Sequence, residues 1–211
     1  MNKSKKMYLF GAGGHAKVIW DATRSTEMSL SGCFSDSNDQ SFHESLIYLG
    51  KLTDEFDNGD NYLHIAIGNN RVRKEKSKQF KCSYYNVKHL NSSVSNLASI
   101  GIGNSFLSQS VVNPFSKIMN HCIINTGSII EHDCELSDYV HVSPNATLCG
   151  NVKVGEGTHI GAGAVILPNI KIGKWVTIGA GAVVLKDVPD YAILVGNPGQ
   201  IIKYNTDKNE E

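Results

Sequence analysis

An apolar residue recurs at every sixth position across the second half of the chain, and no other feature constrains the fold as strongly. The series starts at Val94 and ends at Val184 without a gap or a change of phase. A period of six fits neither the 3.6-residue α-helix nor the alternation of a hairpin sheet. It is typical of a solenoid whose coil has three short flat sides, each with one inward apolar side chain. Three sides make an 18-residue coil, so residues 94–184 predict about five stacked parallel coils.

Two other positions of the hexad describe the corners of this solenoid. The residue after an inward position is often glycine, as at Gly101, Gly155 and Gly161, and we expect these glycines to take the positive φ of a tight corner. In the second half of the repeat, the residue two before each inward position is small or β-branched, which suits short strands and narrow corners. That set is Ala146, Val152, Thr158, Ala164, Ile170, Val176 and Ala182.

The N-terminal part lacks the hexad and alternates short apolar runs with helical patterns. Strands are expected near residues 7–10, 33–34, 63–67 and 84–87, with helices after His15 and after Asn70. Strand–helix–strand order predicts a short Rossmann-like α/β domain with a parallel sheet over residues 1–90. A parallel β-helix domain then follows over residues 91–211.

Three loops follow the predicted strands and meet at one edge of the sheet, where parallel sheets bind their ligands. They are residues 11–15, 35–37 and 68–70. Gly11, Gly13 and Ala16, with Asp36 further along the chain, match a dinucleotide-binding spacing. The domain is only about half of a dinucleotide-binding fold. We therefore favour a nucleotide diphosphate held by the glycine loop and the helix N-terminus, with glycines that serve only the turn as an alternative.

Composition excludes several classes of partner. Lys plus Arg and Asp plus Glu both number 20, so a neutral chain has no electrostatic reason to bind nucleic acid or acidic membranes. There is no apolar run long enough for membrane insertion and no signal segment, so we expect a cytoplasmic protein. The five cysteines form no Cys-x-x-Cys pair, which indicates reduced, mostly buried thiols and no metal site. They are Cys33, Cys82, Cys122, Cys134 and Cys149.

Four motifs now stand together: Gly-Ala-Gly-Gly-His-Ala-Lys-Val from Gly11, Ile-Gly-Asn-Asn-Arg-Val-Arg from Ile67, Glu-His-Asp-Cys from Glu131, and Gly-Asn-Pro from Gly196. This combination resembles the bacterial nucleotide-amino-sugar N-acetyltransferases, a group of hexapeptide-repeat acyltransferases that also includes sialic acid O-acetyltransferases. The resemblance covers about residues 7–203. It implies a left-handed β-helix, acetyl-CoA as co-substrate, and a homotrimer with active sites between chains.

The same resemblance assigns the acceptor site to the α/β domain. The nucleotide-linked amino sugar would contact three loops, through Gly13, Gly14, His15, Asp36, Ser37 and Gly68. The family often has a second acidic residue where this chain has Ser37. The nucleotide, whether UDP, dTDP or GDP, therefore stays open.

Catalytic residues follow from the Glu-His-Asp-Cys motif. By resemblance, His132 is the general base, and histidine suits this role because it titrates near working pH. Asp133 would stabilise the imidazolium form, but neighbouring strand residues point to opposite faces. Asp133 therefore reaches His132 only if the chain bends locally or if one partner acts across a subunit boundary, and Glu131 is the other candidate. The N–H of Gly150 would stabilise the oxyanion.

The resemblance assigns the acetyl-CoA site to the later coils. His141, Ala162 and Ala180 would contact acetyl-CoA, and Lys186 and Lys203 are candidates for its phosphates. Two histidines outside the motifs, His121 and His159, are interpreted as surface or interface residues.

These assignments lead to an N-acetyltransferase for the 4-amino group of a nucleotide-linked 4-amino-4,6-dideoxy sugar, supplying O-antigen of lipopolysaccharide, capsule or protein glycosylation. Transfer would be direct, because Cys134 is the only thiol near the site and has no activating context. Two alternatives remain open. One is O-acetylation of sialic acid or a related sugar, and the other is a non-catalytic nucleotide-binding scaffold.

Overall fold

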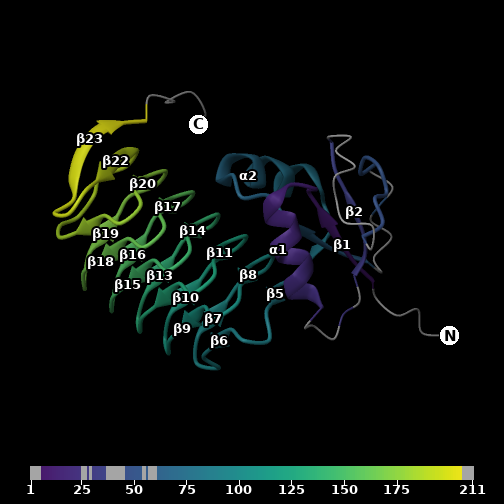
Figure 1. The fold of residues 1–211 in the computed structure, drawn as a ribbon, viewed down its shortest axis with the longest axis horizontal. Helices are drawn as coiled ribbons and strands as arrows, with labels where there is room; N and C mark the ends of the chain where they lie inside the picture. The colour runs from purple at the N-terminus through teal and green to yellow at the C-terminus, as the bar shows by residue number, and fades with distance from the viewer. Residues whose placement is uncertain are drawn as a thin grey trace.

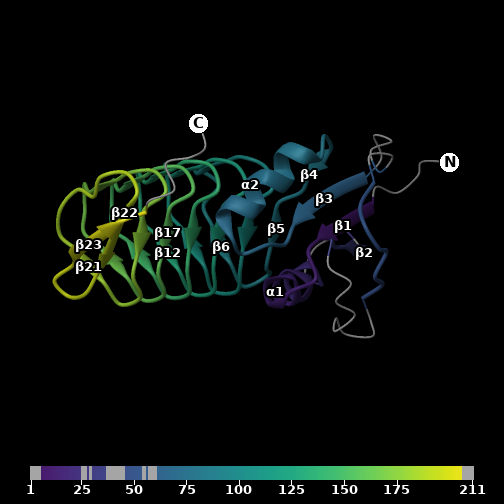
Figure 2. The same cartoon turned by 90° about the horizontal axis from the view of Figure 1, so that it is seen from above.

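The protein has two parts that lie side by side, an α/β domain and a solenoid (Figures 1 and 2). The structure is a computed structural model that describes residues 6–24, 28, 30–36, 46–53, 56 and 61–205. One helix of the α/β domain lies between its sheet and the first coils of the solenoid, and the other lies along the solenoid (Figures 1 and 2). Hydrogen bonds such as that from Asn70 Nδ2 to Gly157 O join the two parts.

The described residues of the α/β domain form a four-stranded sheet and two helices. The strands are β1 (Lys6–Phe10), β2 (Leu30–Phe34), β3 (Asn61–Ile65) and β4 (Ser83–Tyr84), and the helices are α1 (Gly14–Thr23) and α2 (Asn70–Gln79). The sheet order is β2-β1-β3-β4 and every pair is parallel. The predicted short βαβ domain is therefore confirmed.

Buried side chains on the two faces of this sheet explain its position. Ala16, Ile19 and Ala22 lie three residues apart on α1 and pack with Met7 and Leu9 of β1. This three-residue spacing gives a helix one apolar stripe, which covers one face of the sheet. A second cluster on the other face contains Phe10, Leu63, Ile65 and Phe80.

The solenoid consists of three sheets built almost wholly from two-residue strands. The helix-facing sheet contains β5 (Val87–Lys88), β8 (Ser105–Phe106), β11 (Ile123–Ile124), β14 (His141–Val142), β17 (His159–Ile160), β20 (Thr177–Ile178), β22 (Ala192–Val195) and β23 (Gln200–Tyr204). The apolar sheet contains β6 (Ser93–Val94), β9 (Val111–Val112), β12 (Ile129–Ile130), β15 (Thr147–Leu148), β18 (Val165–Ile166) and β21 (Val183–Val184). The charged sheet contains β7 (Ser99–Ile100), β10 (Lys117–Ile118), β13 (Glu135–Leu136), β16 (Lys153–Val154) and β19 (Lys171–Ile172).

The strand pairing confirms the 18-residue coil. Ile124 pairs with Val142, and Val142 pairs with Ile160, in parallel register. Among the described strand pairs, only β22 with β23 is antiparallel. The eight-stranded helix-facing sheet thus has seven parallel strands, so the solenoid is longer than the five coils predicted from the unbroken hexads. The strand predicted at 84–87 is divided, because Tyr84 pairs with Leu63 whereas Val87 pairs with Ser105.

Each coil has three corners, and a residue with positive φ occupies every one from Gly103 to Gly181. The first corner, from the helix-facing to the apolar sheet, includes residues 145 and 163. The second, from the apolar to the charged sheet, includes residues 133 and 151. The third, from the charged to the helix-facing sheet, includes residues 121, 139 and 157.

The glycines expected to supply positive φ have a different role. Gly155 and Gly161 are not among the residues with positive φ, so that prediction was wrong. A Cβ at either position would lie 2.5 Å from a backbone atom of the next coil. Glycine is therefore required there for the close approach of successive coils.

The described residues contain no helix with the length and apolar character needed to cross a membrane. Cys33, Cys122 and Cys134 are buried, and Cys82 and Cys149 are half-buried.

Candidate active site

His132 and Asp133 form a hydrogen-bonded pair on the second corner of the solenoid. His132 Nδ1 lies 2.8 Å from Asp133 Oδ2, and more than half of each side chain is exposed. Asp133 has φ 60°, so the chain turns between the two residues and both side chains point the same way. The local bend considered from the sequence is therefore present. Among the described contacts of His132, the carboxylate partner is Asp133 and not Glu131.

Gly150 lies one coil further along, directly against the imidazole of His132. A Cβ at Gly150 would lie 2.6 Å from His132 Cε1, so a larger residue would displace the ring. The backbones of the two corners are also joined, since Asn151 N–H donates to His132 O at 2.9 Å. None of the described residues accepts a hydrogen bond from the Gly150 N–H. This donor is available beside the imidazole.

Cys134 follows the pair but points into the solenoid. Its side chain is fully buried, and its Sγ–H donates to Cys149 O at 3.2 Å. Burial raises the pKa of the Cys134 thiol to about 11. A thiol that is neutral and buried at neutral pH is a poor nucleophile.

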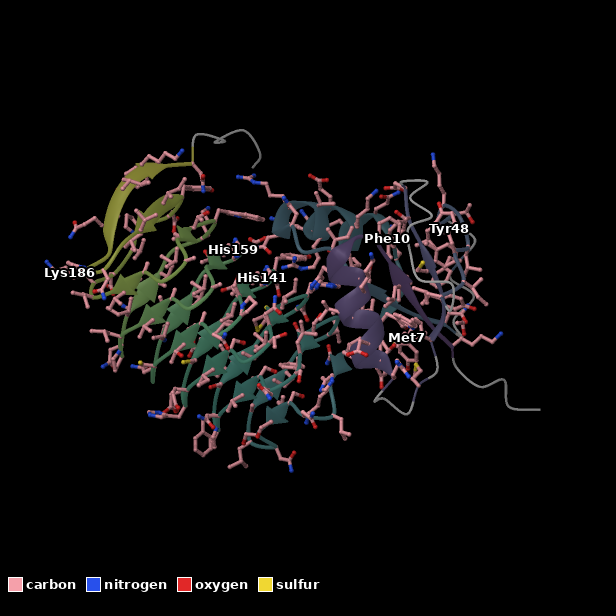
Figure 3. All side chains as sticks on the ribbon, in the orientation of Figure 1. Met7, Phe10, Tyr48, His141, His159 and Lys186 are labelled. Atoms are coloured by element: carbon pink, nitrogen blue, oxygen red, sulfur yellow. The ribbon has the colours of Figure 1, made fainter. Side chains whose placement is uncertain are left out.

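A second histidine cluster lies on the helix-facing sheet, under the α/β domain. His141 and His159 occupy equivalent positions on β14 and β17, and their rings stack with centroids 4.9 Å apart (Figure 3). Asn125 Nδ2 lies 3.0 Å from His141 Nε2, and Ser143 Oγ lies 2.7 Å from His159 Nε2. His141 and His159 thus form a polar floor on the helix-facing sheet.

The α/β domain closes over this floor. The His15 ring lies 6.3 Å from that of His141, and a Cβ built on Gly68 would lie 3.9 Å from His15 Cβ. Burial, with lesser contributions from neighbouring histidines and Arg73, lowers the pKa of His141 to about 2 and that of His15 to about 3. His15 Nε2 is buried without a hydrogen-bond partner among the described residues. Both rings are neutral at working pH.

The remaining acceptor-site residues lie at the open edge of the sheet. Gly13 and Gly14 are exposed at the N-terminus of α1, which has no side-chain cap, and nothing lies within 4 Å of a Cβ built on either. Asp36 forms an ion pair with Lys76 of α2 at 2.6 Å. Ser37 lies outside the described residues.

The small residues assigned to acetyl-CoA lie together on the first corner. Ala162 and Ala180 are both exposed, and Gly181 N–H donates to Ala162 O at 2.8 Å. Lys186 and Lys203 are exposed toward the C-terminal end of the solenoid, where Figure 3 labels Lys186.

The structure thus divides the candidate residues into two groups within one chain. His132, Asp133 and Gly150 lie at the second corner, between the apolar and charged sheets. His15, Gly68 and His141 lie over the helix-facing sheet, on another side of the three-sided solenoid. The predicted base and the predicted acceptor loops are therefore not brought together by a single chain.

The sequence did not predict the burial of His121 or of Arg73. His121, expected at the surface or at an interface, lies where the two domains meet, is only 5% exposed and stacks on Tyr139, with Tyr84 against its edge. Arg73 was counted in a basic helix, but it is 1% exposed. Both residues lie where α2 and β4 cover the third corner, and the hexad pattern gives no signal for that cover.

Comparison with known proteins agrees with this two-part fold. The PglD N-terminal domain family matches residues 6–80, and the bacterial transferase hexapeptide family matches residues 133–168 and 151–186. PerB from Caulobacter crescentus, solved in complex with CoA and GDP-perosamine, is 30% identical, with a TM-score of 0.87 over 94% of this chain and 97% of that one. This chain belongs to the hexapeptide-repeat acetyltransferases that carry a PglD-type N-terminal domain.

Two further relatives support this membership. The acetyltransferase domain of PglB from Neisseria gonorrhoeae FA1090 is 31% identical, with a TM-score of 0.86 over 94% of this acetyltransferase and 100% of that chain. A GDP-perosamine N-acetyltransferase from Escherichia coli O157:H7 is 34% identical over 102 residues, which span 44% of this chain and 43% of that protein. The likeness to the solved family members also confirms the left-handed β-helix.

Proposed function

We propose that this protein transfers the acetyl group of acetyl-CoA to the 4-amino group of a nucleotide-linked 4-amino-4,6-dideoxy sugar. The observation that carries the proposal is the exposed His132–Asp133 pair, with an imidazole beside the Gly150 N–H. The relatives solved with CoA and GDP-perosamine give the substrate class. Acetyl-CoA would place the reaction in the cytoplasm, and the product would supply O-antigen, capsule or protein glycosylation.

The two domains divide the substrates. Residues 1–90 would bind the sugar nucleotide, with its diphosphate at the uncapped N-terminus of α1, where Gly13 and Gly14 leave open space. Residues 91–211 would bind acetyl-CoA along the first corner, where Ala162 and Ala180 expose backbone without bulky side chains. His141 would meet the acetyl end, because it lies between these two regions.

The proposed reaction needs one base and one oxyanion donor. The amine nitrogen attacks the thioester carbonyl as His132 accepts its proton through Nε2, while Asp133 holds Nδ1 and stabilises the imidazolium that forms. The Gly150 N–H donates to the developing oxyanion. The carbon–sulfur bond then breaks, and the proton passes to the thiolate, so the products are the N-acetyl sugar nucleotide and CoA.

The separation of the two groups of residues supports a shared site in a homotrimer. The helix-facing sheet is covered by the α/β domain, and the charged sheet presents residues such as Lys117 and Glu135 to solvent. The apolar sheet presents Val111, Ile129 and Val165 instead, all partly exposed. A face of this composition suits burial against a second copy. That contact would bring His132 of one chain toward the acceptor loops of another.

Thiol release from acetyl-CoA tests the proposal against UDP-, dTDP- and GDP-linked 4-amino sugars and free sialic acid. Turnover with one nucleotide-linked amine is the expected result and would identify the nucleotide. Turnover with sialic acid alone would overturn N-acetylation and support O-acetylation. Binding of the sugar nucleotide with no CoA release from any acceptor would leave only the scaffold.

A further inference from the structure

Arg73 is the largest side chain that the described part of the protein buries completely. It lies in the first turns of α2, a helix whose other basic residues are at least partly exposed. Arginine is rarely buried unless all its donors are satisfied and the site needs its fixed geometry. The contacts of Arg73 therefore indicate what it holds in place.

All five N–H groups of the guanidinium have an oxygen acceptor. Nε donates to His121 O at 2.8 Å and Nη2 to Tyr139 O at 3.0 Å, which are backbone carbonyls of successive third corners. Nη1 donates to Ile67 O at 2.9 Å and to Gly68 O at 3.2 Å. The second Nη2 hydrogen reaches Asn70 Oδ1 at 2.8 Å. One side chain thus joins the Gly68 loop to the solenoid.

This arrangement carries a cost in folding free energy. Within the described ranges no carboxylate forms an ion pair with Arg73, and burial lowers its pKa only to about 10, so it stays charged at neutral pH. Apolar residues of similar volume often replace buried charges without loss of stability. Simple packing of two domains does not require this cation, whereas a fixed position for the Gly68 loop does.

The Gly68 loop lies near His141, the residue to which the proposed function assigns acetyl-CoA. The Gly68 carbonyl accepts from Arg73, and a Cβ built on Gly68 would lie 3.9 Å from His15 Cβ. The His15 ring lies 6.3 Å from the ring of His141, which also lies beside Asn125 and stacks on His159. The order of neighbours is therefore third corner, Arg73, Gly68, His15, His141.

We propose that Arg73 is a positioning residue that fixes the Gly68 loop against the solenoid and thereby sets the place of His141 for the acetyl donor. This inference rests on the proposed function, which assigns acetyl-CoA to His141. Arg73 touches no reacting atom in this scheme and acts only through the loop.

A double-mutant cycle on the Kd for acetyl-CoA, measured by calorimetry on the full chain, tests the inference without an acceptor. Arg73→Lys keeps the charge but cannot reach four carbonyls at once, so we expect about tenfold weaker binding. In the His141→Ala background, the same change should weaken binding by less than about threefold, because the two residues act as one unit.

Lys74→Ala is the matched control. Lys74 follows Arg73 on α2 and joins the same two domains through Glu156 and the Trp175 ring, but it has no contact with Gly68. Its loss should leave the Kd within about twofold, as expected for a partly exposed ion pair. Asn70→Ala removes one Arg73 acceptor, together with the bonds from Asn70 Nδ2 to Gly157 O and Thr158 O, and serves as the second variant if Arg73→Lys fails to fold.

Equal weakening by Arg73→Lys with and without His141 would overturn the inference and leave the proposed function intact. The same conclusion would follow if Asn70→Ala acted equally in both backgrounds. No acetyl-CoA binding by the unmodified protein would instead overturn the proposed function. Strong coupling in the cycle, with Lys74→Ala silent, would establish Arg73 as a positioning residue.

Discussion

Histidines lie in opposite surroundings in two regions of the molecule. One region is the second corner, which carries His132, and the other is the junction between the α/β domain and the solenoid, which carries His64, His121 and His141. At the corner, the His132 side chain is 60% exposed and hydrogen-bonded to a carboxylate. At the junction, burial lowers the pKa of His64 and His121 to about 4, and that of His141 to about 2. The buried cation Arg73 contributes to the lowering at all three.

In the proposed mechanism, this difference separates the residue that transfers the proton from the residues that position the substrates. A general base must accept a proton near neutral pH, which requires solvent or a carboxylate to stabilise the cation. Only the corner histidine has both. The junction histidines stay neutral, so their use lies in hydrogen bonding and shape. The following experiments test this contrast, from the largest expected effect to the smallest.

Replacing His132 by Ala should cause the largest loss. We expect kcat to fall by about 10²- to 10⁴-fold, the range for a lost general base. Because the side chain is mostly exposed, the melting temperature should stay nearly unchanged. Thiol-release kinetics and thermal unfolding check both points. Near-normal turnover would remove His132 from the base role.

Mixing two variants tests whether the His132 and the His15 of one active site come from two different chains. The test is to co-express His132→Ala with His15→Ala and to measure thiol release from the mixed oligomers. If one chain supplies His132 and its neighbour supplies His15, about a quarter of the sites regain both residues in a random symmetric mixture. Activity no higher than that of either variant alone would place the whole site in one chain.

Acid should destabilise the protein through its junction histidines. Their pKa values in the folded state lie below the unfolded value of 6.5, so the unfolded chain binds more protons as pH falls below 6.5. Stability present above pH 6.5 is therefore lost toward pH 4. His121→Phe keeps a ring between Tyr84 and Tyr139 but removes one of these protonation sites.

Urea unfolding at pH 7 and pH 5 measures this effect. The loss of unfolding free energy between the two pH values should be about 2 kcal/mol smaller for His121→Phe than for the unmodified protein. The pH 7 value of each variant is its own control. An unchanged pH dependence would contradict the buried, neutral state of His121.

Replacing Cys134 by Ala should have the smallest effect on catalysis. The thiol is buried, with a pKa of about 11, and faces the core rather than the imidazole. We expect kcat within about twofold of the unmodified protein and a loss of about 1 kcal/mol in stability from the cavity. A loss of kcat comparable to that of His132→Ala would indicate an acyl-enzyme.

The solenoid was readable from the sequence because each coil repeats the same requirement. One inward apolar residue per side is enough to specify the core, and Val94 to Val184 supply it without interruption. Corner conformation was not readable. Positive φ falls on residues as different as Asp133, Tyr139 and Asn151, because the stacked coils impose it whatever the side chain. For that reason the sequence alone does not decide whether Asp133 reaches His132, whereas the positive φ of Asp133 in the structure explains the contact.

The burial of Arg73 and His121 between the two domains could not be predicted from the sequence either. Neither Arg73 nor His121 belongs to a repeating pattern, and both are polar residue types that normally face solvent. Their burial depends on the docking of α2 along the third corners, which joins residues 48 positions apart in sequence, as in Arg73 Nε to His121 O. The sequence of a short helix rich in Lys and Arg does not indicate which one of its basic residues is buried.

Docking of α2 also bears on the register of the α/β domain against the coils of the solenoid. Inward residues 18 positions apart are mostly interchangeable Ile, Val or Leu, so a solenoid shifted by one whole coil would keep its core. The contacts of the α/β domain are not interchangeable. Ser77 meets the Tyr139 hydroxyl at 2.8 Å, and Tyr84 meets the His121 ring, each at one particular coil. These contacts fit one coil register, so a solenoid shifted by one coil would lose them.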